Sequence, residues 1–254
     1  MGPLELLGIY SMAIIIVSLI GGSLPLLYSW SSKQLHLFTG LSAGFFIAAC
    51  FLSLLPEAVH MMGASEALLL VMIGFVTLLF IERVILSHHH KRHGDGDEVC
   101  EHAHELTSTA AFIGLAVHGS MAGFALGVAA MVQDDAGILV FLAIIAHKGI
   151  EVMALATTFR LADISVRRSM LLVGLFTLIV PVAAFVAVPF IDLLEHFEVG
   201  APIALAAGTF LYVGVYDLLP EAFHLEKSGY RAFLSVVIGI VVMYLFSILT
   251  GHIH

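Results

Sequence analysis

The sequence predicts an all-α integral membrane protein with eight transmembrane helices. Of its 254 residues, 60% are hydrophobic and only 11% are charged, and the mean hydropathy is +1.06. A membrane-spanning helix takes roughly 20 apolar residues, so the chain has room for about eight spans and little else. A repeated motif relates spans one to three to spans six to eight, around a central pair formed by spans four and five. We therefore treat residues 1–254 as a single transmembrane domain.

The spans follow one another with short polar connections. Residues 1–30 lack a basic leader region and are long enough to span, so we interpret them as a retained helix and not as a cleaved signal. The predicted spans cover residues 4–29, 35–61, 66–87, 107–132, 136–161, 168–190, 200–222 and 230–251.

The orientation follows from Lys and Arg. Of the ten Lys and Arg residues, nine lie in connections on one side of the membrane, and Lys148 lies within a span. The connections on the opposite side carry only acids. The positive-inside rule then places the basic connections in the cytosol and both termini outside, and we expect the plasma (inner) membrane. The nine basic residues that share one side are Lys33, Arg83, Lys91, Arg92, Arg160, Arg167, Arg168, Lys227 and Arg231.

Charge and cysteine content exclude other classes of protein. The net charge of -9 argues against a nucleic-acid partner and favours cationic ones. Only two cysteines are present, Cys50 inside a span and Cys100 in a polar loop, so a disulfide framework is not expected.

An internal repeat joins the two ends of the chain. The segment 54–60 near the end of span two reappears as 218–224 near the end of span seven, and 43–46 matches 207–210 at the same offset. The two spans run in opposite directions, which is typical of transporters. One interpretation is that each Pro-Glu pair simply ends a helix at the interface. The other, which two inverted copies favour, makes metal-path residues of Glu57 and His60 at the outer mouth and of Glu221 and His224 at the inner mouth.

The central pair carries the main candidate site. His118 lies in the middle of span four, and His147 and Glu151 lie four residues apart in the middle of span five. The spacing of four puts the latter two on one helix face. Such groups are costly in hydrocarbon without partners. His118 and His147 each lie about eleven residues from opposite ends of antiparallel spans, so the three side chains predict a nitrogen and oxygen site for a divalent transition metal.

Lys148 is the difficult residue of span five. It could neutralise Glu151, three residues further on, as a structural ion pair. Because it points about 100° away from His147, however, we expect it to pair elsewhere, with Asp217 as the candidate partner.

One long polar connection, residues 88–106, is rich in histidine. It is either a solvated charged linker or a low-affinity cytosolic metal acceptor or sensor, and the number of histidines favours the second. Its candidate metal-binding residues are His88, His89, His90, His93, His102 and His104.

These segments resemble the ZIP (Zrt/Irt-like) family of divalent metal transporters. The resemblance covers nearly the whole chain, including eight spans and a histidine-rich loop between spans three and four. It implies import of Zn²⁺ or Fe²⁺ toward the cytosol through a site between spans four and five, and commonly a homodimer moving by an elevator-like step. The segments that carry it are His118 with Gly123-Phe124-Ala125-Leu126-Gly127, His147-Lys148-x-x-Glu151, Leu54-Leu55-Pro56-Glu57-Ala58 and Gly208-Thr209-Phe210-Leu211-Tyr212-Val213.

The chain departs from the common family pattern in span four. Many members have an asparagine and an acid where this chain has Gly119 and Ala122, and they hold two metals there. We therefore expect no binuclear centre and carry over only His118, His147 and Glu151 as ligands. Span five has Ile150 where proline is usual, so unwinding of that helix is not expected. Secondary candidates are Ser120, Met121 and Cys50.

The sequence therefore predicts transport of divalent transition-metal ions, Zn²⁺ first, with Fe²⁺, Mn²⁺ and Cd²⁺ as alternatives. The metal is the substrate, and no resident cofactor or enzyme activity is expected. Two other functions stay open. A membrane-embedded metal hydrolase would need a general base beside the metal, with Asp217 as the one acid at a suitable depth. A metal-sensing receptor would depend on the loop, so deleting residues 88–105 would separate it from a transporter.

Overall fold

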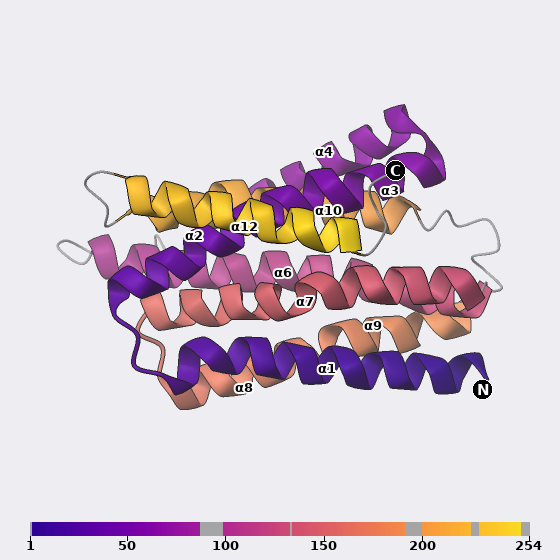
Figure 1. Ribbon diagram of the computed structural model, residues 1–254, viewed down its shortest axis with the longest axis horizontal. Coiled ribbons are helices and arrows are strands. Elements are labelled where there is room, and N and C mark those ends of the chain that lie inside the picture. The colour runs from indigo at the N-terminus through magenta and orange to yellow at the C-terminus, as the bar shows by residue number, and fades with distance from the viewer. Residues whose placement is uncertain (1, 87–98, 133, 191–199, 225–228, 250–254) are drawn as a thin grey trace.

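The computed structural model describes residues 2–86, 99–132, 134–190, 200–224 and 229–249 of the chain. Within these ranges the chain is helical without strands, and eight helices are long and apolar enough to cross a membrane. They run side by side along the long axis of the molecule (Figure 1). The predicted fold class is confirmed. The eight helices cover Pro3–Leu27, Ser32–Met62, Ala64–Val84, Ala111–Met131, Gly137–Leu161, Val166–Phe190, Gly200–Phe223 and Tyr230–Ile248.

Several spans are built from more than one helical segment. Span two joins α2, a π-helical turn η1 and α3, and span seven joins α10, η4 and α11 in the same order. The segments are α1 (Pro3–Leu27), α2 (Ser32–Ala49), η1 (Cys50–Leu54), α3 (Leu55–Met62), α4 (Ala64–Phe80), η2 (Ile81–Leu86), α6 (Val99–Val132), α7 (Asp134–Leu161), α8 (Val166–Thr177), α9 (Ile179–Ala187), α10 (Gly200–Tyr212), η4 (Val213–Leu218), α11 (Leu219–Phe223) and α12 (Tyr230–Leu249).

Local residues explain the sharp turns between the first three spans. The Ser31 side chain accepts a hydrogen bond from the backbone N–H of Gln34 and caps the start of α2. Gly63, with φ at 90°, turns the chain from α3 into α4. This conformation costs little for glycine because it has no Cβ atom.

The two π-helical turns occupy equivalent places in the internal repeat. Each one directly precedes a Leu-Pro-Glu segment, with Pro56 after η1 and Pro220 after η4. Proline has no backbone N–H, so it leaves the carbonyl four residues earlier without its helical donor. For Pro56 that carbonyl belongs to Leu52, and it accepts a hydrogen bond of 3.3 Å from the hydroxyl of Ser247 on α12. The repeat therefore extends from sequence to backbone geometry.

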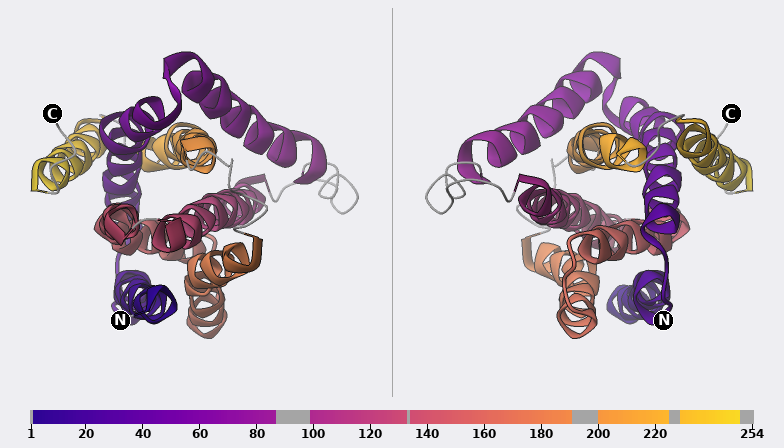
Figure 2. Two further views of the ribbon diagram at one scale, coloured as in Figure 1. Left: turned by 90° about the vertical axis from the view of Figure 1, so that its right-hand side faces the viewer. Right: turned by 90° about the vertical axis from the view of Figure 1, so that its left-hand side faces the viewer.

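Helices of one repeat pack against helices of the other. A Cβ atom at Gly44 of α2 would collide with the carbonyl oxygen of Val236 on α12, and one at Gly208 of α10 would collide with that of Val71 on α4. Glycine thus allows the two backbones of each pair to touch. Figure 2 shows both pairs, α2 beside α12 and α10 beside α4. Because the two contacts are equivalent in the repeat, they confirm the inverted arrangement of spans one to three and six to eight.

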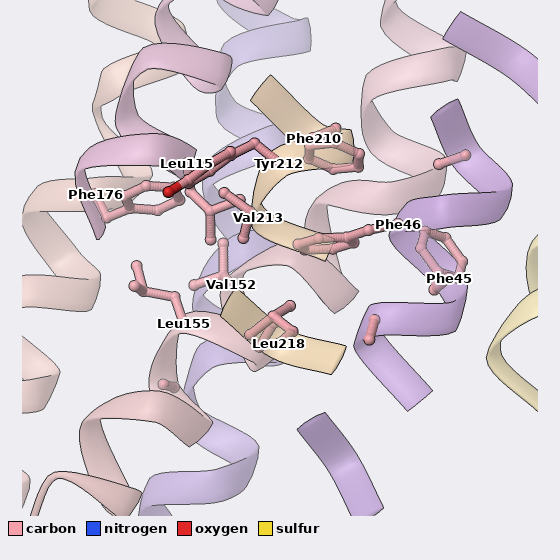
Figure 3. Close-up of a cluster of buried hydrophobic side chains, with 14 of the residues drawn as sticks. Phe45, Phe46, Leu115, Val152, Leu155, Phe176, Phe210, Tyr212, Val213 and Leu218 are labelled. Carbon is pink, nitrogen blue, oxygen red and sulfur yellow. The ribbon is translucent and has the colours of Figure 1, made fainter. Parts of the chain in front are cut away.

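A cluster of large side chains fills the centre of the bundle (Figure 3). Its members come from α1, α2, α4, α6, α7, α8, α10, η4 and α12, and include Phe45, Leu115, Leu155, Phe176 and Val213. Phe46 and Phe210, which are equivalent in the repeat, stack on each other with ring centroids 4.3 Å apart. The two repeats therefore meet at this pair of rings.

One predicted boundary was wrong. Helix α6 begins at Val99, eight residues before the predicted start of span four, so His102 and His104 lie on a helical extension and not in a loop. The prediction ended the helix where apolar residues stop, but the segment 99–106 contains Glu, Ala and Leu, which favour helix outside the membrane too. His88, His89, His90 and His93 lie outside the described residues, as do the side chains of His102 and His104.

Candidate metal centre

The three predicted central residues come together. His118 lies in the middle of α6, and His147 and Glu151 lie one turn apart in α7. All three side chains are buried, with exposed fractions of 1%, 4% and 0%. Each offers one ligand atom, and these atoms all lie within 4.8 Å of one another. The imidazole centroids of the two histidines are 5.7 Å apart. This spacing leaves room for one ion with metal–ligand distances near 2.0–2.2 Å after small side-chain adjustments.

Three polar atoms of this group have no hydrogen-bond partner among the described residues. They are Nε2 of His118, Nε2 of His147 and Oε2 of Glu151. A buried donor or acceptor without a partner typically costs about 1–3 kcal/mol, and a charged one costs more. Three such atoms at one point, from two helices, are therefore expensive unless something binds between them.

The other ring nitrogen of each histidine is held by a backbone carbonyl. Nδ1 of His118 donates to the carbonyl of Ala206 on α10, at 3.1 Å. A backbone hydrogen bond to Ala143, one turn earlier in α7, holds the ring of His147. A proton on that nitrogen leaves the lone pair on Nε2, which is the arrangement of metal-binding histidines generally.

The aromatic ring of Phe210 covers the group from α10. Its centroid lies 3.9 Å from that of His118, in a stacked arrangement, and 5.4 Å from that of His147. The sequence analysis used Phe210 only as part of the repeat. Its contact with the histidines depends on how α10 packs against α6, which no local pattern reveals.

Lys148 was assigned the wrong partner. Its ammonium lies 2.8 Å from Oε1 of Glu151, with both side chains buried, and 4.8 Å from the ring centroid of Phe176. Asp217 lies instead beside Glu82 and Arg83. The direction of the Cα–Cβ bond does not fix where a lysine ammonium lies, because four flexible bonds let it turn back along the helix. The carboxylate of the group is therefore paired with the ammonium of Lys148.

Comparison with known proteins decides the family. The model of the ZIP zinc transporter family matches residues 4–111 and 86–247, which together cover nearly the whole chain. The chain belongs to this family. It is similar to zinc transporter ZIP9 of Micropogonias undulatus, at 25% identity over 85% of this chain and 84% of the relative. Zinc transporter ZIP9-A of Xenopus laevis is 26% identical over the same shares, and zinc transporter ZIP1 of Takifugu rubripes is 23% identical over 91% and 93%.

Two secondary candidates of this ZIP-family chain, Ser120 and Cys50, make contacts elsewhere. The hydroxyl of Ser120 donates to the carbonyl of Ala116 in its own helix, at 2.8 Å. Cys50 is buried in a separate apolar cluster with Ala125 and Ile203. Met121 is half-buried on α6, and its role as a ligand stays a prediction. The structure therefore gives a metal ion two nitrogens and one carboxylate in this group.

The repeat motif places its polar residues at opposite ends of the bundle. Glu57 and His60 lie on α3, where Glu57 is half-buried and His60 is exposed. At the other end, Glu221 lies on α11, His224 follows it, and both lie near His36 at the beginning of α2. The sequence analysis did not single out His36, because it stands in no motif and lies next to a predicted boundary.

Proposed function

We propose that this chain carries a divalent transition-metal ion, Zn²⁺ first, across the membrane through a site formed by His118, His147 and Glu151. One observation supports the proposal most strongly. The three buried atoms without hydrogen-bond partners converge from two helices at mid-span. Two imidazoles and a carboxylate form a donor set that zinc accepts, and a fourth position would stay open for water. The relatives described above are zinc transporters, which also favours zinc.

Direction is part of the proposal. The segregation of Lys and Arg supports both termini outside, and import toward the cytosol rests on the resemblance to the ZIP family. On the cytosolic side of the site lie large side chains of the central cluster, among them Leu155, Tyr212 and Leu218 (Figure 3). On the other side, the apolar cluster combines small residues such as Ala125 with larger ones such as Ile203. The side chains on the cytosolic side would have to part for an ion to leave inward.

The ligand set favours transport over hydrolysis. Within the described part of the chain, the group contains no second acid and no cysteine to serve as a general base. Asp217, which the hydrolase hypothesis needed, lies beside Glu82 and Arg83. In this proposal the metal is cargo and the chain holds no resident cofactor. A homodimer, the plasma membrane and a sensing role of residues 88–106 stay predictions.

Metal flux into vesicles tests the proposal. Purified full-length protein is reconstituted, and saturable uptake of radioactive Zn²⁺ is measured with competing Fe²⁺, Mn²⁺ and Cd²⁺. His147→Ala and Glu151→Ala should each lower uptake at least about tenfold, since each removes one of three ligands. Ser120→Ala serves as the matched control, because its hydroxyl bonds only its own helix in the structure. Unchanged saturable uptake in correctly inserted His147→Ala and Glu151→Ala proteins would overturn the assignment.

A further inference from the structure

We propose that the Lys- and Arg-rich ends of α1, α7 and α8 together bind an anionic phospholipid. Arg167 and Arg168 at the start of α8, with Arg160 at the end of α7, would hold the phosphate of its headgroup. Its acyl chains would lie along the exposed faces of α1 and α8. This surface contains none of the central metal ligands, so lipid binding does not depend on the proposed transport function.

The three arginines lie on either side of one short connection. Arg160 lies in the last turn of α7, and Arg167 and Arg168 lie in the first turn of α8. The connection is a tight turn, in which the backbone N–H of Asp163 donates to the carbonyl of Arg160 at 3.3 Å. This turn brings the three basic side chains to one end of the bundle.

No acid neutralises these charges within the part of the chain that the structure describes. Asp163 is the one acid of the connection, and it forms no ion pair with any of the three arginines. Nε of Arg160 is buried and has no hydrogen-bond partner among the described residues. The first turn of α8 also contains no acid, although a helix N-terminus favours negative charge there. The charges at this end therefore favour an anionic ligand.

Apolar side chains continue from the arginines along both helices. Leu171 and Leu175 follow Arg167 at intervals of four residues, with exposed fractions of 62% and 53%. On α1, Ile20 and Leu24 have the same spacing and exposed fractions of 62% and 41%. A spacing of four places side chains on one helix face. Positive charge at the end followed by an apolar face matches the order of groups in an anionic phospholipid.

Helices α1 and α8 are neighbours at this end. A Cβ atom at Gly22 of α1 would lie 2.7 Å from Cγ1 of Val173 on α8 and 2.7 Å from Cγ1 of Val152 on α7. From this contact, α1 continues for five residues and α8 extends back for seven. At about 1.5 Å per residue, both helix ends lie roughly 8–11 Å beyond the contact. Figure 2 shows α1 and α8 side by side at one edge of the bundle.

Trp30 provides a natural probe beside this surface. It is the single tryptophan of the chain. Its Nε1 donates to the carbonyl of Leu24 at 3.2 Å, so the indole folds back along α1, and its ring meets that of Phe38 edge-on with centroids 4.9 Å apart. Such rings are typical of the membrane–water interface. Lys33, three residues further on, adds another exposed positive charge.

Quenching of Trp30 fluorescence by brominated lipids tests the proposal. Full-length protein is reconstituted in phosphatidylcholine vesicles with increasing fractions of brominated phosphatidylglycerol or brominated phosphatidylcholine, with bromine at the same acyl position. Each basic residue near the surface strengthens the attraction of anionic lipid about fivefold. Brominated phosphatidylglycerol should therefore reach half-maximal quenching at a mole fraction at least about fivefold lower than brominated phosphatidylcholine. Arg167→Gln/Arg168→Gln should reduce this ratio below about twofold.

Two matched variants separate this surface from a general attraction of anionic lipid to the basic end of the protein. Lys227→Gln/Arg231→Gln removes the same number of charges from the connection between α11 and α12, and should leave the ratio unchanged. Arg167→Lys/Arg168→Lys keeps both charges and should retain at least about half of the preference. Equal half-maximal fractions of the two lipids with the unaltered protein, or an equal fall of the ratio in the two glutamine variants, would overturn the proposal.

Discussion

Removing the ammonium of Lys148 is the sharpest test of the central site. In the structure this ammonium lies 2.8 Å from Glu151 with both side chains buried, so the two form a buried pair of opposite charges. Lys148→Met keeps an apolar chain of similar length and leaves the carboxylate without its cation. Removing one partner of a buried ion pair typically costs 3–5 kcal/mol. At roughly 2–4 °C per kcal/mol, the melting temperature of the metal-free protein should fall by roughly 6–20 °C.

Zn²⁺ should reverse most of that loss. A divalent ion between His118, His147 and Glu151 gives the carboxylate a new cation, and in the variant it no longer meets a neighbouring ammonium. Two unit charges 4 Å apart interact by about 4 kcal/mol at an effective dielectric constant of 20. The affinity for Zn²⁺ should therefore rise by more than about tenfold in Lys148→Met.

The assay is thermal unfolding of the purified protein in detergent, with and without Zn²⁺, together with a direct binding titration. The double variant Lys148→Met/Glu151→Gln removes both charges and should recover most of the metal-free stability. If Lys148→Met without metal is as stable as the parent, or if Zn²⁺ raises the melting temperatures of the two proteins equally, the reasoning about the ion pair is wrong.

Two other predictions concern packing between spans. Gly208→Ala should lower the free energy of unfolding by about 1–3 kcal/mol, because its methyl group would collide with the backbone at Val71, whereas Gly8→Ala has no neighbour within 4 Å and should cost nothing. Equal stability of the two variants would contradict the close backbone contact. Tyr212→Phe removes a hydroxyl that donates to Glu82 at 2.6 Å, and should cost about 1.5–3 kcal/mol in the same unfolding assay. A loss below about 0.5 kcal/mol would show that water replaces this hydrogen bond.

Much of the fold could be predicted because the membrane imposes simple rules. Apolar length gave the eight spans, and the matching Leu-Pro-Glu segments gave the inverted repeat. The central residues could be predicted because His118, His147 and Glu151 are polar groups in apolar helices, separated by distances that place them at one depth. Here sequence spacing maps directly onto height in the bilayer.

The remaining features depend on contacts that spacing does not encode. The partner of Lys148 depends on the path of a flexible side chain, so the predicted pairing with Asp217 was wrong. His36 stands at a span boundary with no motif, and only the packing of α2 against α11 brings it to Glu221. The start of α6 was misplaced because hydropathy marks where a helix enters the membrane and not where it begins.

Spans of the first repeat pack against spans of the second, and this packing constrains the order in which the protein assembles in the membrane. Gly44 and Val236 are in contact in the folded protein but are 192 positions apart in the sequence. Span two therefore cannot pack against span eight until span eight has been synthesised. At 5–20 residues per second, synthesis of the intervening chain takes roughly 10–40 s. During that interval the glycine-rich face of span two has only lipid or an insertion factor to cover it. Biogenesis of this protein thus requires that span two remain unpaired with span eight in the membrane until span eight is inserted.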